Sequence, residues 1–357
     1  MLYIAAERVR RQSYNILRAW GQSDEHANTT ADILTETDLR GIDSHGLSML
    51  PVYQEQLATK LNMRPDIRVV RETPVSALID ADGGLGHVPA HQGMTLAIDK
   101  AKRAGVGVVV VRRSAHFGAA GYYSDMAARA GLLGIATTSA RGLALVPTFA
   151  AEPVFGTNPI SVAAPAGRNA PFNLDMATTT VAAGKLKLKW LNDKPLPVGW
   201  AVDEQGQPLT DAKRAFELKN ITPLGGTREL GSHKGYGLAA VVNILSATLS
   251  GAAFQPLRLQ REDPAGPDNV GHFFLALDPT MFREEGEFEH DMDEMLDYMR
   301  QVRRADPAQP VLVPGDPEYA AREERLREGI PVPEKLDGLI RSVCEASGAS
   351  YVLTGAA

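Results

Sequence analysis

Residues 92–137 read QGMTLAIDKAKRAGVGVVVVRRSAHFGAAGYYSDMAARAGLLGIAT and decide the fold class. Apolar side chains recur at helical spacing from Gln92 to Arg103. The run Val106–Val111 is β-branched apart from one glycine, which is typical of a strand that is buried on both faces. A second helical pattern over Ala120–Ala130 and a second strand pattern over Leu133–Thr137 follow in the same order. This alternation predicts an α/β architecture of mixed α+β type.

Similar patterns continue on both sides of this stretch. Further strands and helices are expected at residues 160–164, 172–176, 233–249, 273–277 and 336–343, with a long amphipathic helix that begins at Glu284 and is ended by Pro307. Two helices precede Gly41. Because chain termini are often close together, we expect residues 1–75 and 305–357 to form one helical domain. Residues 76–304 then form the α/β domain, with room for an inserted subdomain.

The composition excludes several classes of protein. The 357 residues carry 43 acidic and 37 basic side chains, and this net charge of −6 argues against a nucleic-acid partner. With 44% hydrophobic and 22% charged residues, the chain is not a disordered one. No apolar run reaches the ~18 residues that a membrane-spanning helix needs. Cys344, the one cysteine, cannot form an intrachain disulfide, so we expect a reducing, cytoplasmic location and no membrane partner.

One nucleotide-binding motif is missing. No Gly-x-Gly-x-x-Gly sequence follows any expected strand, since both Gly105-Val-Gly107 and Gly235-Tyr-Gly237 lack the third glycine. A dinucleotide could therefore bind this chain only by a route other than that of the Rossmann fold.

His45 lies in a loop, Arg40-Gly-Ile-Asp-Ser-His-Gly46, directly after an expected helix. Its glycines allow the backbone to turn sharply. Ser44 Oγ is placed to hydrogen-bond either the neighbouring imidazole or a substrate oxygen. The alternative is a histidine that only caps the loop.

His116 lies where an expected strand meets the start of a helix, in Ser114-Ala-His-Phe-Gly-Ala119. Strand ends of this kind hold ligand sites in α/β proteins, and the helix dipole there lowers the pKa of an imidazole. The alternative is again a capping role. His87 and His91 have the spacing of metal ligands on a helix, but Pro89 lies between them and no carboxylate or cysteine is near in the sequence, so we expect no metal site.

Three other segments have the composition of ligand-binding loops. They are Phe155–Pro159 with Thr157, Leu174–Thr180 with Asp175, and Ser232–Gly237 with His233 and Lys234. A cation and small residues at a helix start suit a phosphate group. An ordinary turn, a helix cap and a surface charge explain the same residues equally well.

Together these segments resemble a known family. Six motifs occur in that family's order: Asp43–Gly46 (DSHG), Ala115–Gly118 (AHFG), Phe155–Pro159 (FGTNP), Leu174–Ala177 (LDMA), His233–Gly237 (HKGYG) and Val313–Gly315 (VPG). The chain resembles the type-2 malate/L-lactate dehydrogenases from about Leu39 to Gly329. This family includes ureidoglycolate and sulfolactate dehydrogenases, 2,3-diketogulonate reductase and Δ1-piperideine-2-carboxylate reductase.

The resemblance implies hydride transfer between NAD or NADP and a small 2-hydroxy or 2-oxo acid, or a related cyclic imine. It implies a non-Rossmann dinucleotide-binding domain, here residues 76–304. It also implies a homodimer in which the neighbouring subunit completes the active-site cleft.

Catalytic roles carry over to four positions by resemblance. His45 would protonate the forming alkoxide with help from Ser44, although some members assign this role to the residue that matches His116. We keep both histidines and favour His45. Asp175 would orient the catalytic imidazole. A histidine that titrates near neutrality suits such proton transfer, which is typically worth ~10²- to 10⁴-fold in rate.

Binding roles carry over in the same way. Thr157 and Tyr53 would contact the substrate. The residues implied for the cofactor are Asp175, Met176 and Ala177 beside the nicotinamide, and His233, Lys234, Pro314, Gly315 and Asp316 at the ribose and phosphates. The choice between NAD and NADP is not readable, because the acidic-residue rule for the ribose belongs to Rossmann folds.

One position departs from the family. Met49 stands where the family usually has an arginine that binds the substrate carboxylate, an interaction worth roughly 1.5–3 kcal/mol. Arg141 follows an expected strand on the same edge as His116, and we hypothesise that it replaces this arginine. The alternative is that Met49 forms an apolar wall for a bulkier substrate and Arg141 is only solvated.

Three functions therefore stay open. The first is a malate- or lactate-like dehydrogenase. The second is an NADPH-dependent reductase of a cyclic imine or bulkier keto acid. The third is a homologue that binds the cofactor without turnover. A hydrolase built on Ser44 and His45 is disfavoured, because no nucleophile-elbow sequence accompanies them.

Overall fold

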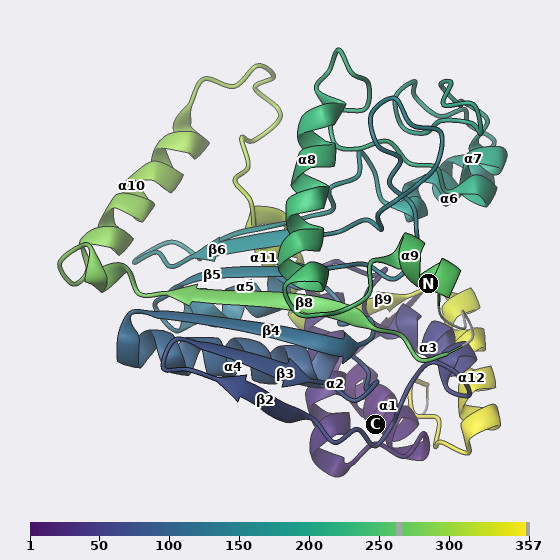
Figure 1. The fold of residues 1–357 in the computed structure, drawn as a ribbon, viewed down its shortest axis with the longest axis horizontal. Coiled ribbons are helices and arrows are strands. Elements are labelled where there is room, and N and C mark those ends of the chain that lie inside the picture. Colours follow the sequence, from purple (N-terminus) through teal and green to yellow (C-terminus); the bar gives the residue numbers. More distant parts are fainter. Residues whose placement is uncertain (262–265, 355–357) are drawn as a thin grey trace.

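A computed structural model describes residues 1–261 and 266–354 and contains a mixed seven-stranded sheet (Figure 1). Its strands are β2 (Arg68–Glu72), β3 (Ser76–Asp80), β4 (Val106–Ser114), β5 (Leu133–Thr138), β6 (Ile160–Ala164), β7 (Phe172–Met176) and β8 (Val270–Leu277). They lie in the order β2-β3-β4-β8-β5-β6-β7. Only the β3–β4 pair is parallel, and every other neighbouring pair is antiparallel. The predicted mixed α/β class is confirmed.

Helices α4 (His87–Ala104) and α5 (Ala120–Arg129) share one apolar cluster with the central strands. Phe274 of β8 is fully buried in this cluster. Gly107 of β4 allows α4 to lie close to the sheet, because a Cβ there would be 2.0 Å from the carbonyl oxygen of Ala97. The stretch from residue 92 to residue 137 is thus helix, strand, helix and strand as predicted. Helix α4 begins earlier than expected, since Pro89 is tolerated in a first turn.

The other face of the sheet is contacted by the end of the apolar helix. Helix α8 (Ser232–Asn243) continues into a π-helical turn, Ile244–Thr248. Ser246 in this turn lies 2.6 Å, oxygen to oxygen, from Thr137 of β5. A Cβ on Gly271 of β8 would be 2.0 Å from the carbonyl oxygen of Ser246, so glycine is needed for this close approach.

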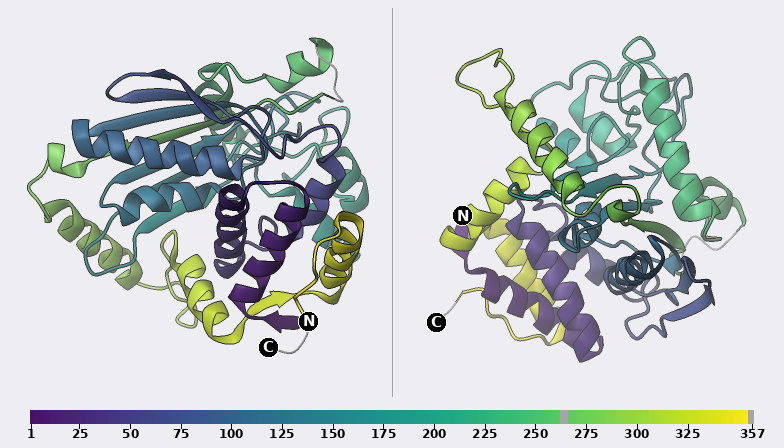
Figure 2. Two further views of the ribbon diagram at one scale, coloured as in Figure 1. Left: turned by 90° about the horizontal axis from the view of Figure 1, so that it is seen from below. Right: turned by 90° about the vertical axis from the view of Figure 1, so that its left-hand side faces the viewer.

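The two ends of the chain lie side by side (Figure 2). Strands β1 (Leu2–Ile4) and β9 (Ile330–Val332) pair antiparallel. The helices of this region are α1 (Ala6–Ala19), α2 (Asp24–Leu39), α3 (Leu50–Gln56), α11 (Asp316–Glu328) and α12 (Glu334–Ser347). Buried residues from both ends form a second apolar cluster, which includes Ile16, Leu34 and Ile340. This shared cluster supports our proposal of one domain built from residues 1–75 and 305–357, except that β2 within this range pairs with β3 in the sheet.

A third apolar cluster lies in the segment between β7 and α8. It contains α6 (Ala183–Leu191) and α7 (Ala212–Leu218), with Leu186, Ala215 and Ile221 buried at its centre. This cluster supports the proposed inserted subdomain. Every helix of the described residues is too short or too polar to cross a bilayer.

Some element boundaries differ from expectation. The helix expected from Glu284 to Pro307 is α10 (Glu287–Gln301), which begins after Gly286 at φ 83° and ends where Val302 becomes extended. Helix α9 (Gln255–Arg261) and helices α3, α6, α7 and α11 were not predicted from the sequence. Helix α11 buries no residue and therefore shows no apolar stripe in the sequence.

Candidate active site

The loop that carries His45 is fixed by a buried carboxylate near the end of α2. Asp38 is 4% exposed, and its Oδ2 accepts a hydrogen bond of 2.8 Å from the backbone N–H of Leu47. Gly46 lies directly against this carboxyl group, because a Cβ there would be 2.0 Å from Oδ1. Burial raises the pKa of Asp38 to about 7. Sequence reasoning missed Asp38, although an acidic residue beside an arginine-glycine helix end was a visible signal.

The structure brings His45 and His116 together. Their ring centroids are 5.4 Å apart, although 71 positions separate them in the sequence. Ser44 Oγ lies 2.7 Å from Nδ1 of His45. Both imidazoles are half-buried, and burial lowers the pKa of His45.

His116 has a different set of partners. The backbone N–H of Gly118 donates to its Nδ1 at 3.3 Å, and the hydroxyl of Tyr53 lies 2.7 Å from the same nitrogen. Burial, with the nearby charges of His45 and other groups, places the pKa of His116 well below its usual value. Tyr53 has no exposed surface, so its hydroxyl reaches the site through His116.

His87 lies behind this pair. Its ring centroid is 6.4 Å from that of His116 and 5.8 Å from that of Tyr53. The ring is fully buried, which lowers its pKa to about 3, and neither nitrogen has a hydrogen-bond partner among the described residues.

Arg141 lies near His116, since its positive charge contributes to the lowered pKa of that imidazole. Its Nε is 3.0 Å from Oδ2 of the buried Asp268, and 36% of its side chain is exposed. Arg141 is therefore anchored by a carboxylate and not merely solvated. Met49 is half-buried and packs against the apolar cluster of the terminal helices.

Asp175, at the end of β7, accepts a 2.7 Å hydrogen bond from the backbone N–H of Gly121 in α5. Burial, with a smaller contribution from the negative charge of the nearby Glu318, raises its pKa to about 6. Among the described residues, no hydrogen bond joins Asp175 to His45 or His116. The Nδ1 atoms of these two rings lie next to the hydroxyl groups of Ser44 and Tyr53 instead. A pocket beside this carboxylate is lined by Thr37, Ile42, Ala119, Gly121, Asp175 and Gly315, among others.

The segment Pro314-Gly315-Asp316 lies beside β7. The carbonyl oxygen of Pro314 accepts a hydrogen bond of 3.1 Å from the backbone N–H of Asn173. Gly315 has φ 104°, and a Cβ there would be 3.0 Å from the ring of Tyr319. The carboxylate of Asp316 is occupied, because Arg300 donates to it at 2.7 Å and the backbone N–H of Val313 at 3.0 Å. Asp316 thus holds the loop in shape.

A chain of contacts connects the remaining predicted residues. Thr178, just after Met176 and Ala177, donates from its backbone N–H and its hydroxyl to the carbonyl oxygen of Thr157. The carbonyl of Thr178 accepts from the N–H of Leu224, and Leu224 packs against Gly235 of α8. His233 and Lys234 are exposed at the start of this helix, where Arg228 Nη1 lies 2.9 Å from His233 Nδ1.

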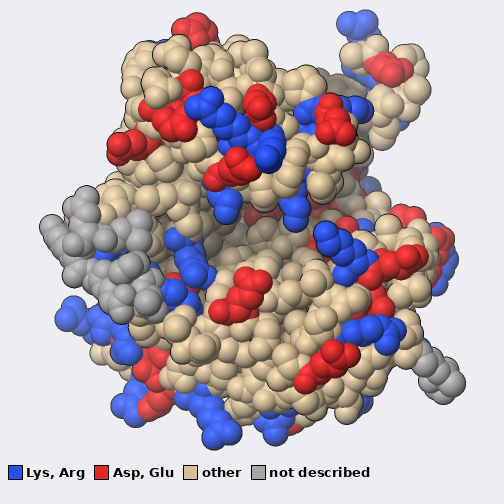
Figure 3. Space-filling model, turned by 90° about the vertical axis from the view of Figure 1, so that its right-hand side faces the viewer, with Lys and Arg blue, Asp and Glu red and all other residues tan. Residues whose placement is uncertain are grey.

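Asn158 lies in the expected ligand loop Phe155–Pro159 without a role assigned to it, and the structure shows that it connects these loops. It is buried, its side-chain amide donates to the carbonyl of Ala239 in α8, and its oxygen accepts from the N–H of Ala140 beside Arg141. The space-filling view shows a hollow on one face, with Lys and Arg side chains along its rims (Figure 3).

Comparison with known proteins decides the family. The profile of the malate/L-lactate dehydrogenases matches residues 4–339. The chain belongs to this family. It is 40% identical to the malate dehydrogenase of Pyrococcus horikoshii over 323 residues, which cover 90% of this chain and 89% of that protein. It is 38% identical to the L-sulfolactate dehydrogenase of Methanocaldococcus jannaschii over 338 residues, or 94% of each. The solved malate dehydrogenase of Entamoeba histolytica superposes with a TM-score of 0.88 at 30% identity, covering 98% of this chain and 99% of that one.

Membership of the malate/L-lactate dehydrogenase family makes the chain an oxidoreductase of hydroxy acids that works with a nicotinamide cofactor. The donor set fits such a cofactor. At the start of α8 the backbone N–H groups of Ser232 and Lys234 donate to the carbonyls of Thr227 and Gly231, so the exposed side chains of His233 and Lys234 are the groups that suit a phosphate. Gly121 and Gly315 add no side chain to the pocket wall beside Asp175. When bound, the nicotinamide supplies or accepts the hydride.

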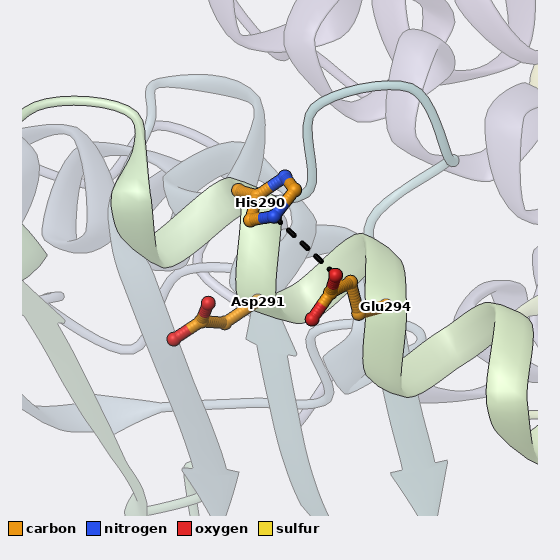
Figure 4. A group of neighbouring side chains, drawn as sticks. All are labelled: His290, Asp291 and Glu294. Carbon is orange, nitrogen blue, oxygen red and sulfur yellow. Dashed lines mark ion pairs between the residues drawn. The ribbon is translucent and has the colours of Figure 1, made fainter.

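One group of neighbouring side chains elsewhere could in principle bind a cation. His290, Asp291 and Glu294 place ligand atoms within 4.8 Å of one another on α10 (Figure 4). All three are exposed, and His290 Nε2 lies 3.4 Å from a carboxylate oxygen of Glu294. Exposed acidic side chains on one helix are common without any ion, so we assign no function to this group.

Proposed function

We propose that the protein interconverts a small 2-oxo acid and its 2-hydroxy acid in the manner of a malate or lactate dehydrogenase, with NAD or NADP as cofactor. The observation that carries this proposal is the His45–His116 pair, with ring centroids 5.4 Å apart and an anchored arginine nearby. Two imidazoles can bind and protonate a developing alkoxide. A guanidinium can bind the adjacent carboxylate.

Each side chain has a task that follows from its contacts. Ser44 orients the ring of His45 through Nδ1, and the backbone of Gly118 orients His116. Arg141 keeps its Nη atoms for the substrate carboxylate while Asp268 holds its Nε. Thr157 contacts the substrate from the turn that Thr178 fixes. These groups align the reacting carbon, which lowers the entropic part of the barrier.

For the cofactor we propose two groups of residues. Asp175, Met176 and Ala177 line the nicotinamide side, at the end of β7. His233 and Lys234, together with the backbone of Pro314 and Gly315, hold the ribose and phosphates. Because the carboxylate of Asp316 is bound to Arg300, we propose that Asp316 supports this loop.

Met49 favours a second candidate function. An apolar, half-buried side chain stands where the family usually has an arginine, and an apolar wall suits a ring or a longer chain better than a small charged acid. The alternative is therefore reduction of a cyclic imine acid or a bulkier keto acid with NADPH.

The test is a substrate panel monitored by absorbance of the reduced nicotinamide. Pyruvate, oxaloacetate, larger 2-oxo acids and cyclic imine acids are each tested with NADH and with NADPH. Turnover of the small 2-oxo acids supports the first proposal, and turnover of imines or bulky keto acids alone supports the second. Cofactor binding without turnover of any member of the panel would refute both.

We further propose a cytoplasmic homodimer whose neighbouring subunit completes the cleft. The support for a reducing compartment is that Cys344 is a free, buried thiol. Light scattering of the purified protein measures the oligomeric state, and a monomer with full activity would contradict this proposal.

A further inference from the structure

The two histidines differ in what their Nδ1 atoms face. Nδ1 of His116 accepts from the backbone N–H of Gly118, and a backbone amide can only donate. Nδ1 of His116 must therefore be the unprotonated nitrogen, so the hydroxyl of Tyr53 donates to it as well. The proton of the neutral ring is on Nε2. No hydrogen bond within residues 1–261 and 266–354 occupies that Nε2–H.

His45 has a partner that adapts to either protonation state. Ser44 Oγ lies 2.7 Å from Nδ1 of His45. A hydroxyl donates to an unprotonated nitrogen, and after rotation it accepts from a protonated one. His45 can therefore gain or lose a proton without losing its partner. A second proton on His116 would instead bring two N–H groups face to face at Gly118.

We propose that the two histidines divide the work: His45 exchanges the proton with the substrate oxygen, and His116 stays neutral and donates an Nε2–H hydrogen bond to that oxygen. This inference rests on the proposed function, because it assigns roles within the same oxidoreduction. Tyr53 is then a positioning residue that acts through His116.

The proton and electron balance follows directly. In the reducing direction a hydride adds to the carbonyl carbon and the π-electron pair moves to the oxygen. The new O–H bond forms as the N–H bond of protonated His45 breaks, and neutral His45 is reprotonated from solvent. His116 keeps its proton throughout, so it acts as a fixed donor toward the developing negative charge.

Electrostatics of the pair agrees with this division. Burial lowers the pKa of His45, whereas burial and neighbouring charges, including Arg141, place that of His116 well below its usual value. Of the two, His45 is the ring that gains a proton more readily.

The direct test is ¹⁵N NMR of histidine-labelled protein between about pH 5 and 9, the range in which histidines change charge. The spectra of His45→Gln and His116→Gln assign the two rings. We expect His116 to show an unprotonated Nδ1 and an Nε2–H throughout, and His45 to titrate. An Nδ1–H on His116, or a titration of His116 ahead of His45, would overturn the proposal. Tyr53→Phe should leave the tautomer unchanged, because the amide of Gly118 remains.

Kinetics gives an independent readout. Glutamine places an amide N–H near the position of Nε2, so His116→Gln should keep at least about tenfold more turnover than His116→Ala, which loses a donor worth about 10²- to 10³-fold. His45→Gln should lose as much turnover as His45→Ala, about 10²- to 10⁴-fold, together with the pH-dependent limb of the profile. If the limb disappears in His116→Gln and survives in His45→Gln, the division is wrong.

These outcomes remain separable from those of the proposed function. If wild-type protein turns over no acid or imine of the panel, the proposed function fails, while the NMR spectra still determine which ring is locked and which titrates. Circular dichroism and dinucleotide affinity of each variant establish that it is folded.

Discussion

The Asp38 carboxyl group should make the stability of the protein fall as pH rises. Burial raises its pKa from 3.8 to about 7. Between these values the unfolded chain releases the proton that the folded chain keeps, so stability declines with pH across this window. At about 1.4 kcal/mol per pH unit, the full cost above pH 7 is about 4 kcal/mol. Because the side chain is almost completely buried, solvent screens little of this cost.

Asp38→Asn removes the charge and keeps an oxygen that can accept from Leu47. We expect this variant to be more stable than wild type, and its advantage to be about 2–3 kcal/mol larger at about pH 8 than at about pH 5. Urea unfolding followed by circular dichroism at both pH values measures this difference. Asp38→Ala is the control: it also loses the pH dependence, but it leaves the Leu47 N–H unpaired and should be less stable than Asp38→Asn by about 1–3 kcal/mol at both pH values. A pH-independent difference between Asp38→Asn and wild type would refute the reasoning.

Three other changes test the site and its support. Arg141→Ala should raise KM for every accepted acid by about 10- to 100-fold, which corresponds to the loss of a charge-assisted pair. Arg141→Lys should raise KM less. An unchanged KM of Arg141→Ala in steady-state assays would show that Arg141 does not bind the substrate. Gly46→Ala should lower the free energy of unfolding in urea by about 1–3 kcal/mol, because the added Cβ overlaps the carboxyl group of Asp38. The variant should also lose most of its kcat, and wild-type turnover would contradict this. Asp125→Ala should cost about 3–5 kcal/mol, since it leaves the buried Arg40 without its main partner; a thermal melt equal to wild type would show that other carboxylates compensate.

The sequence predicted the central elements well because each has a strong local pattern. The β-branched run that forms β4 is buried between β3 and β8, and the helices on either side of it each carry an apolar stripe. The unpredicted helices are either short, such as the seven-residue α3, or have little to bury. Helix α11 contributes contacts through charged side chains, such as Arg325 with Asp43, and such contacts leave no periodic signal.

The sequence predicted which loops form the site, but it did not predict which side chains of these loops contact one another. Glycines, histidines and hydroxyl groups mark the loops around Ser44 and His116, yet no local rule states that Tyr53 would donate to the imidazole of His116 across 63 positions. The anchoring of Arg141 by Asp268 also depends on tertiary contacts. Resemblance supplied an expected carboxylate partner for the imidazole, whereas the structure gives Asp175 to the backbone of Gly121.

The distance between the two histidines is set by elements outside the site. Arg40 ends α2 and precedes the loop of His45, while Asp125 lies in α5, the helix that follows the loop of His116. The guanidinium of Arg40 binds the carboxylate of Asp125, and both side chains are almost completely buried. This ion pair joins α2, which leads into the loop of His45, to α5, which follows the loop of His116. A buried ion pair contributes little net stability compared with apolar packing. We therefore expect this pair to act mainly by fixing the relative position of the loops of His45 and His116, which the proposed chemistry needs close together.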